Sequence, residues 1–142
     1  MSTKILVVED VQAIYEYYLR VFEQILPMAD LEFTHAGSIQ AACAVLENPF
    51  DIILMDYSLG APFLAPGATK PIRNGAELIQ VRLLLERRGV VRQALFFGTS
   101  SSKIGNDLLT RAGAHYIFHK TRVEELANAL KTTYKNLKES EA

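Results

Sequence analysis

Five polar side chains stand directly after, or close to the end of, short apolar runs. Glu9 and Asp10 follow the first run, Asp56 the next, Thr99 another and Lys120 the last. Carboxylates that gather at one place repel one another, and a hard cation with oxygen ligands, most naturally Mg²⁺, relieves that repulsion. A lysine amine beside them supplies a point charge suited to phosphate, and a carboxylate can itself attack phosphorus to give an aspartyl phosphate. If the fold brings these residues together, they predict phosphoryl transfer onto a protein carboxylate.

The apolar runs themselves predict the strands that must position these residues. Short continuous runs of this kind are typical of strands buried on both faces, whereas an alternating run is typical of a half-exposed edge strand. Apolar residues at helical spacing fill the intervals between the runs. We therefore expect buried strands at 5–8, 52–55, 94–97 and 115–118, an edge strand at 31–35, and helices near 11–26, 39–46, 74–88, 104–112 and 123–138.

Five strands that alternate with five helices predict an α/β fold with a doubly wound parallel sheet, covered by helices on both faces. In such sheets the ligand site lies outside the carboxyl ends of the strands, at a topological switch point. The five polar residues follow strand ends in the chain, so they are expected on that one rim.

Composition excludes several classes of protein. The chain has 142 residues, one domain's length, of which 49 % are hydrophobic and 22 % charged, so it is neither disordered nor collagen-like. Fifteen Lys and Arg against sixteen Asp and Glu leave a net charge of −1, which gives no footprint for direct nucleic-acid binding. No apolar run is long enough for a membrane span. The single cysteine, Cys43, excludes an internal disulfide, so we expect a cytoplasmic protein without a membrane partner.

With these residues in place, the chain resembles the receiver domains of response regulators in two-component signalling, of the single-domain chemotaxis-regulator type. Each matching piece is weak alone, and their order at successive strand ends makes the set specific. The resemblance covers residues 3–138 approximately, and its motifs are residues 5–10, residues 51–56, Gly98-Thr99-Ser100, Gly113-Ala114 and Lys120. It implies a flavodoxin-like three-layer (βα)5 sandwich with strand order 2-1-3-4-5.

The resemblance also implies a role for each residue of the site. Asp56 resembles the phosphoacceptor, and Glu9 and Asp10 resemble the acidic pair that holds Mg²⁺ together with Asp56. Ser58 stands where the family lends a backbone carbonyl to the metal. Thr99 resembles the switch hydroxyl and Lys120 the lysine that pairs with the phosphoryl group.

The same resemblance implies the partners. The phosphoryl donor is expected to be a sensor histidine kinase or a phosphotransfer protein, and the output a downstream protein partner that reads a shifted surface. We expect residues 1–142 to form one receiver domain, with no output domain and no enzymatic activity beyond gain and loss of the phosphoryl group on Asp56.

The chain departs from the family in three places. The loop at 57–73 is much longer than usual, and we expect it beside the site, where it either shields the site or offers Phe63 and Leu64 to a partner. Ile117 stands where the family has an aromatic switch residue. Thr121 replaces the proline that follows the lysine. We expect a trans Lys120–Thr121 bond, because a cis bond before a non-proline residue costs ~2.5–4 kcal/mol, and we expect Thr121 to begin a capping box with Glu124.

Two alternatives stay open on sequence alone. A pseudo-receiver would keep the fold as a phosphorylation-independent interaction module, and Ile117 favours it while the complete acidic set argues against it. A small α/β phosphatase or nucleotide-binding enzyme is the other, but no glycine-rich phosphate loop is present.

Overall fold

The structure is a computed structural model that describes residues 2–141. Strands and helices alternate along the whole chain, with one short 3₁₀ helix before the second strand. In order they are β1 (Thr3–Val8), α1 (Gln12–Ile25), η1 (Met28–Asp30), β2 (Leu31–Ala36), α2 (Ile39–Val45), β3 (Ile52–Asp56), α3 (Gly75–Arg87), β4 (Leu95–Ser100), α4 (Lys103–Ala112), β5 (Tyr116–His119) and α5 (Val123–Glu141).

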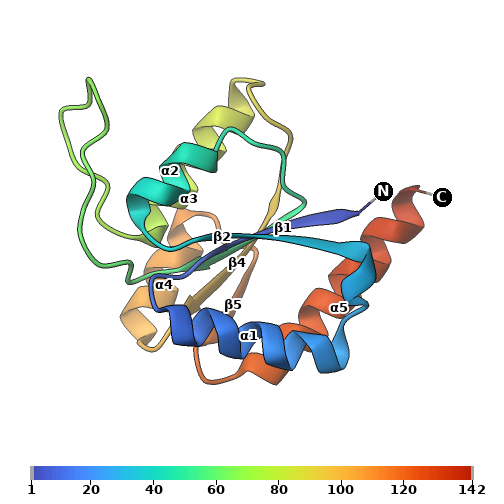
Figure 1. Cartoon of the computed structure of the whole chain (residues 1–142). Coiled ribbons are helices and arrows are strands. Elements are labelled where there is room, and N and C mark those ends of the chain that lie inside the picture. The colour runs from blue at the N-terminus through green and yellow to red at the C-terminus, as the bar shows by residue number, and fades with distance from the viewer. Residues whose placement is uncertain (1, 142) are drawn as a thin grey trace.

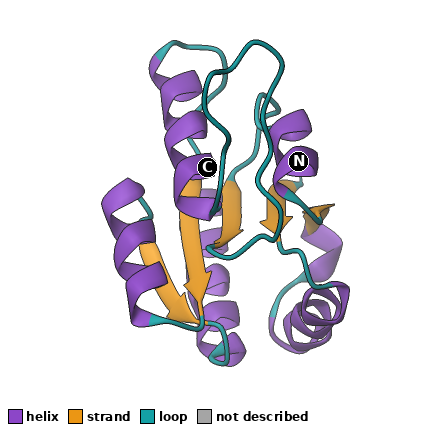
Figure 2. Ribbon diagram, turned by 90° about the vertical axis from the view of Figure 1, so that its left-hand side faces the viewer, coloured by secondary structure: helices purple, strands orange, loops and turns teal. Residues whose placement is uncertain are grey.

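The five strands form one parallel sheet in the order β2-β1-β3-β4-β5. Helices α1 and α5 cover one face, and α2, α3 and α4 cover the other, so the molecule has three layers (Figures 1 and 2). The predicted fold class and strand order are therefore confirmed. The order reverses direction between β1 and β3, which is the switch point where this class of sheet binds its ligands.

Each face of the sheet has its own apolar core. The alternation of side chains along a strand sends successive residues to opposite faces. Ile5, Val7 and Leu54 therefore join the core beneath α1 and α5, while Leu6 and Ile53 join the one beneath α2, α3 and α4. The central strands β1, β3 and β4 are buried on both faces, as their continuous apolar runs predicted, whereas β2 is half-buried at one edge of the sheet. The prediction of a buried strand at 115–118 is wrong, because β5 forms the other edge and is partly exposed.

Local capping chemistry explains most helix boundaries. The Asn74 side chain accepts a hydrogen bond from the Glu77 amide (3.0 Å) and starts α3, as predicted. Ser102 does the same for α4 through the Gly105 amide (3.0 Å). Gly89, just beyond α3, has a φ of 75°, the left-handed conformation that ends many helices and that glycine adopts without strain.

The start of α5 corrects one prediction. The Lys120–Thr121 bond is trans, since residues 2–141 contain no cis peptide, but the predicted capping box is not formed. The Thr121 hydroxyl is 2.8 Å from Nδ1 of His119, and the helix begins two residues later, at Val123. Because the helix begins at Val123, its N-cap position is Arg122, one residue beyond Thr121.

The loop at 57–73 folds back on itself as a hairpin with a single antiparallel bridge. Phe63 and Ile72 pair in an antiparallel bridge through two backbone hydrogen bonds of 3.0 and 2.9 Å, and the segment between them projects from the body of the protein (Figure 1). Phe63 packs against the core beneath α2, α3 and α4, so it is not offered to a partner as expected, whereas Leu64 is 55 % exposed.

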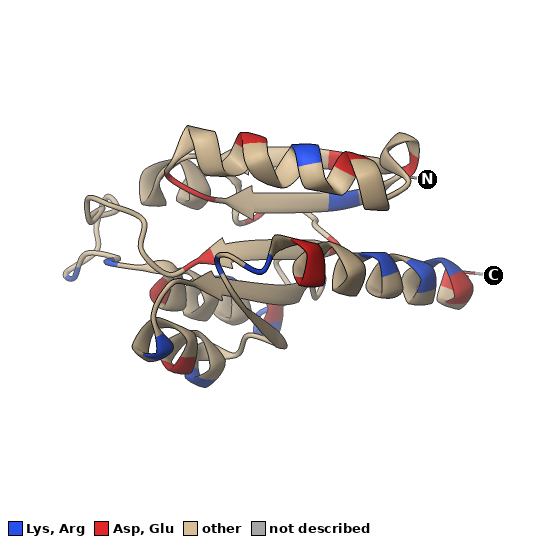
Figure 3. Ribbon diagram, turned by 90° about the horizontal axis from the view of Figure 1, so that it is seen from below, with Lys and Arg blue, Asp and Glu red and all other residues tan. Residues whose placement is uncertain are grey.

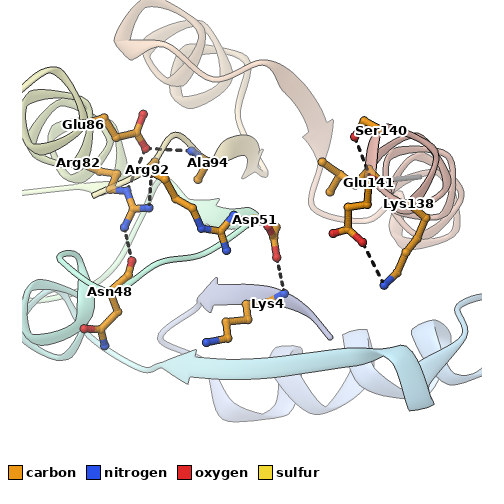
Figure 4. A network of polar contacts seen from close by, with 11 residues as sticks. Lys4, Asn48, Asp51, Arg82, Glu86, Arg92, Ala94, Lys138, Ser140 and Glu141 are labelled. Atoms are coloured by element: carbon orange, nitrogen blue, oxygen red, sulfur yellow. Dashed lines mark hydrogen bonds and ion pairs between the residues drawn. The ribbon is translucent and has the colours of Figure 1, made fainter. Parts of the chain in front are cut away.

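A network of polar contacts lies at the amino ends of the strands, at the opposite end of the sheet from the predicted site (Figure 4). Arg82, which is completely buried, donates hydrogen bonds to the carbonyls of Leu46 and Asn48 and to the carboxylate of Glu86. These bonds join α3 to the turn before β3, because each buried guanidinium donor needs an acceptor. We assign this network a structural role.

Charge of both signs is spread over the helices. Figure 3 shows acidic and basic residues interspersed on α1, α4 and α5. Within residues 2–141, no helix combines the length and the apolar character needed to cross a membrane.

Candidate functional site

Strand parity places four polar side chains over one face of the sheet. Each lies two positions beyond a residue that points into the core beneath α1 and α5, so it continues the same row of side chains. The pairs of core and site residue are Val7 and Glu9, Leu54 and Asp56, Phe97 and Thr99, and Phe118 and Lys120. The core beneath α1 and α5 is thus the floor of the site, at the carboxyl ends of β1, β3, β4 and β5.

Backbone hydrogen bonds extend the sheet to hold these residues in register. Asp56 pairs directly with Thr99 across β3 and β4. The Glu9 amide donates to Ala36 (3.1 Å) and the Lys120 amide to Ser100 (3.1 Å), so both residues continue the ladder beyond their strands. The structure therefore confirms the predicted location of these residues at one rim of the sheet.

Lys120 joins the two buried carboxylates. Its Nζ lies 2.8 Å from Oδ2 of Asp56 and 3.1 Å from Oε1 of Glu9. Glu9 is 0 % exposed and Asp56 is 2 % exposed, so one ammonium group stands against two carboxylates in a poorly solvated place. Such a set is held together by its pairing, since an unpaired buried charge is strongly unfavourable.

Burial governs the protonation of this set. It raises the pKa of Asp56 to about 7, an effect that the Lys120 ion pair reduces and the neighbouring charge of Glu9 increases. Burial also raises the pKa of Glu9, against the opposing hydrogen bonds from the Val11 amide and from Lys120. For Lys120, burial acts to lower the pKa, but the contacts with Asp56 and Glu9 outweigh it and raise the pKa above its usual value.

Glu9, Asp10 and Asp56 form an acidic cluster that fits a hard divalent cation. One carboxylate oxygen from each lies within 4.8 Å of the other two. Glu9 Oε1 is buried, and its partner within residues 2–141 is the ammonium group of Lys120 at 3.1 Å. Asp10 is exposed and opens the cluster to solvent. Two buried oxygens with one exposed oxygen suit Mg²⁺, which uses few protein carboxylates and keeps several waters.

The start of the 57–73 loop runs beside this cluster. Ser58 follows Asp56 by two residues, and its carbonyl accepts no hydrogen bond from the part of the chain that the structure describes. Leu59 is buried and anchors the segment in the core. A β-carbon placed on Gly60 would lie 3.6 Å from Oδ2 of Asp10, which locates the loop against the exposed carboxylate. The expectation that the loop begins beside the site is thus correct.

Gly75 permits the close approach of α3 to Asp56. Its amide donates to the carbonyl of Tyr57 (2.9 Å), and a β-carbon at this position would lie 1.9 Å from the Asp56 carbonyl oxygen. Only glycine fits there. The helical pattern over 74–88 gives no sign of this role of Gly75.

Ile117 lies on the other face of the sheet from Lys120. It packs in the core beneath α3 and α4, and Gly98 is the residue that leaves it room: a β-carbon on Gly98 would lie 2.7 Å from Cδ1 of Ile117. Tyr116 and Phe118 flank it but lie against Phe97 on the opposite face, at ring-centroid distances of 4.8 and 6.1 Å. No aromatic side chain of β5 therefore takes the place of the family's switch residue.

Two residues near the site escaped the sequence analysis. His35 is hydrogen-bonded through Nε2 to the Glu9 carbonyl (2.7 Å), and its ring stacks on Tyr15 at 3.9 Å. Tyr18 extends from α1 and is 2 % exposed, close enough to Thr99 for their side chains to interact. The position of Tyr18 on the helical apolar stripe predicts a core residue, and nothing in that pattern shows where its hydroxyl ends.

No protein-family model matches the chain, and no curated protein sequence matches it. Solved structures do. A CheY-like response regulator receiver domain protein from Methanospirillum hungatei has a TM-score of 0.69 at 22 % identity, over 98 % of this chain and 99 % of that one. The chain has the fold of a response-regulator receiver domain.

Other receiver structures agree with this fold. The receiver domain of a Francisella response regulator has a TM-score of 0.66 at 18 % identity, covering 96 % of this chain and 99 % of that chain. A response regulator from Burkholderia pseudomallei, solved with a phosphorylated aspartic acid, a calcium ion and citrate, has a TM-score of 0.66 at 19 % identity, over 99 % of this chain and 74 % of that one. At these identities the likeness concerns the receiver fold itself.

Proposed function

We propose that this protein is a receiver in two-component signalling that accepts a phosphoryl group on Asp56. The observation that carries the proposal is the position of Lys120, whose Nζ contacts Asp56 at 2.8 Å and Glu9 at 3.1 Å while Thr99 stands beside Asp56 on the next strand. This arrangement puts a nucleophile, a cation for phosphoryl oxygens and a hydroxyl donor at one point. The receiver fold of its structural neighbours supports the same function.

The transfer would proceed by in-line displacement at phosphorus. A carboxylate oxygen of Asp56 attacks the phosphoryl group of a phosphohistidine, the new O–P bond forms as the P–N bond breaks, and the electron pair stays on the imidazole nitrogen. Lys120 then pairs with a phosphoryl oxygen, and Thr99 donates a hydrogen bond to another. Catalysis of this kind is mainly positioning and neutralisation of charge.

We propose Mg²⁺ as the cofactor, held by the carboxylates of Glu9, Asp10 and Asp56 and by the backbone carbonyl of Ser58. When bound, it supplies positive charge against the carboxylates and the phosphoryl oxygens. Mg²⁺ binding also favours the ionised form of Asp56, the form that can attack, because a metal lowers the pKa of a carboxylic acid that it coordinates.

We further propose the setting in which the site works. The donor is a sensor histidine kinase or a phosphotransfer protein in the cytoplasm, residues 1–142 act as one receiver domain, and the output is contact with a downstream protein and not with nucleic acid or a membrane. The protein is a signalling domain and not an enzyme acting on a separate substrate.

A pseudo-receiver is the second candidate, and one contact favours it. Ile117 fills the space over Gly98, so the usual aromatic switch is absent on β5. In that case the fold would serve as an interaction module and Asp56 would stay unmodified.

Intact-mass measurement after incubation with acetyl phosphate and Mg²⁺ separates the two candidates. We expect a labile gain of one phosphoryl group in the wild type and in Asp51→Asn, whose carboxylate lies at the start of β3 and pairs with Arg92. We expect no gain in Asp56→Asn. If the wild type gains nothing in the presence of either acetyl phosphate or a histidine kinase, the pseudo-receiver is the better description.

A further inference from the structure

Tyr18 places a hydroxyl group at the floor of the site, from a helix that the proposed chemistry does not otherwise use. Its ring belongs to the core beneath α1 and α5 and stacks on Phe22 with centroids 5.9 Å apart. The side chain is 2 % exposed, and its hydroxyl has no hydrogen bond of good geometry within residues 2–141. A buried phenol without a partner is unfavourable, and buried Tyr hydroxyls normally have a partner.

The surroundings of this hydroxyl are those of the site. Tyr18 and the row that ends in Thr99 share one face of the sheet, and the Thr99 side chain is near enough to lower the pKa of the Tyr18 hydroxyl. The two hydroxyls nevertheless form no hydrogen bond of good geometry in this state. The charges of Glu9, Asp56 and Lys120 also influence the pKa of Tyr18.

Tyr18 is a donor at neutral pH. Burial raises its pKa to about 12, while the Thr99 side chain acts to lower it and the charge of Glu9 to raise it. The phenol therefore keeps its hydrogen. Thr99 has one hydrogen to donate and two lone pairs that accept. If Thr99 gives its hydrogen to a phosphoryl oxygen, its lone pairs become stronger acceptors, because hydrogen bonds in a chain polarise one another.

We propose that Tyr18 is a positioning residue for the phosphorylated state: its hydroxyl donates a hydrogen bond to Oγ1 of Thr99 when Thr99 donates its own hydrogen to the phosphoryl group on Asp56. The inference rests on the proposed function of the site. It gives the unpartnered phenol a partner in one state only, and it links α1 to the phosphoryl group. That link runs through the face of the sheet opposite to Ile117.

The test uses beryllium trifluoride with Mg²⁺ as a phosphoryl analogue and compares Tyr18→Phe with the wild type. The substitution keeps the ring and removes only the hydroxyl. We expect the analogue to bind roughly fivefold to tenfold more weakly, the loss of about one hydrogen bond in a charged network. Tyr17→Phe is the matched control, because Tyr17 is the neighbouring tyrosine of α1, is 49 % exposed and should bind as the wild type does.

Two further readouts separate positioning from simple packing. Without the analogue, Tyr18→Phe should be at least as thermally stable as the wild type, since it removes an unpartnered hydroxyl from the core. In a Thr99→Val background, Tyr18→Phe should no longer weaken binding, because the acceptor is gone.

Each outcome decides between the inference and the proposed function. If the wild type binds the analogue and Tyr18→Phe binds equally well, the inference is wrong and the proposed function stands. An equal loss in the Thr99→Val background also overturns the inference, since Tyr18 then acts through another group. If the wild type does not bind the analogue at all, the proposed function fails, and the role of Tyr18 fails with it.

Discussion

Asp56 combines two requirements that conflict. As the proposed nucleophile it must be ionised, yet burial raises its pKa to about 7, well above the usual value for an aspartic acid. Between the unfolded and folded values of this pKa, the native state binds more protons than the unfolded state. The free energy of unfolding therefore falls as the pH rises through that interval. The metal-free site is consequently a source of instability at neutral and alkaline pH.

A first prediction follows for stability against pH. We expect the metal-free wild type to lose stability between about pH 4 and pH 7, and Asp56→Asn to be more stable at pH 8 by roughly 2–3 kcal/mol with a flatter pH profile. Urea unfolding at several pH values in the presence of a chelator measures both. A wild-type profile as flat as that of the variant would contradict the raised pKa.

Asp51, directly before β3, is a control because its pKa is shifted in the opposite direction to that of Asp56. Burial acts to raise its pKa, but hydrogen bonds from Arg92 and from the Lys4 amide outweigh burial and lower the pKa. Its contribution to stability is therefore present above its unfolded pKa and is lost as the pH falls through the folded value. We expect Asp51→Asn to destabilise the protein at pH 8, in the opposite direction to Asp56→Asn.

The approach of α3 to β3 depends on the absence of one side chain. A β-carbon on Gly75 would lie 1.9 Å from the Asp56 carbonyl, so Gly75→Ala must push the helix away from the strand that carries the proposed phosphoacceptor. We predict a loss of about 2–4 kcal/mol in the free energy of unfolding and a slower gain of the phosphoryl group. Gly37→Ala is the control, because its β-carbon would have no neighbour closer than 3.8 Å. Equal stability of the two variants would show that α3 shifts freely.

The hairpin in the 57–73 loop can be shortened without touching its base. Replacing residues 64–71 by Asn-Gly keeps the Phe63 and Ile72 pair and supplies a favoured two-residue turn. We predict a change in stability below about 1 kcal/mol, since loop length enters the closure entropy only logarithmically. Phosphoryl lifetime and partner binding are the informative measurements, and a change in either locates a role in the projecting segment. A large loss of stability would instead show that the segment supports the fold.

Helix caps show both the reach and the limit of local sequence patterns. Asn74 and Ser102 cap α3 and α4, because the side-chain oxygen of each accepts a hydrogen bond from a free amide in the first turn of its helix. Thr121 does not cap α5, because the helix begins at Val123 and Arg122 is therefore its N-cap residue. A pattern of four residues does not determine the residue at which a helix begins.

Binding of Mg²⁺ at the proposed metal site would couple that site to the stability of the whole protein. A ligand that binds only the native state stabilises it in proportion to the logarithm of its concentration over Kd, and the carboxylates must be deprotonated to bind. We predict that Mg²⁺ raises the melting temperature more at pH 8 than at pH 6, and that Asp10→Asn reduces the effect. Thermal melts over a Mg²⁺ titration test this. An unchanged Mg²⁺ dependence in Asp10→Asn would remove this residue from the proposed metal site.

The parallel sheet and the gathering of Glu9, Asp56, Thr99 and Lys120 were predictable, because apolar runs that alternate with helices specify parallel strands, and these strands end on one rim. The strand order followed only from the resemblance to receiver domains. Tyr18 was not, because a tyrosine on the apolar stripe of a helix predicts burial of its ring and says nothing about the neighbours of its hydroxyl. The pairing of Phe63 with Ile72 was also beyond reach, since it depends on contacts between a long loop and a distant core.

The alternation of side chains along β3 determines to which face of the sheet Asp56 points. Leu54 and Asp56 share one face and Met55 the other, so inserting one residue between Ile52 and Asp56 would turn the carboxylate toward α3 and present an apolar side chain to Lys120. Inserting two residues would restore the phase. We therefore expect this strand to accept substitutions or paired insertions, and residues 64–71 to accept insertions of odd or even length, because no side-chain alternation has to be preserved there. The alternation of side chains that forms the two cores therefore also determines where insertions are compatible with the proposed site.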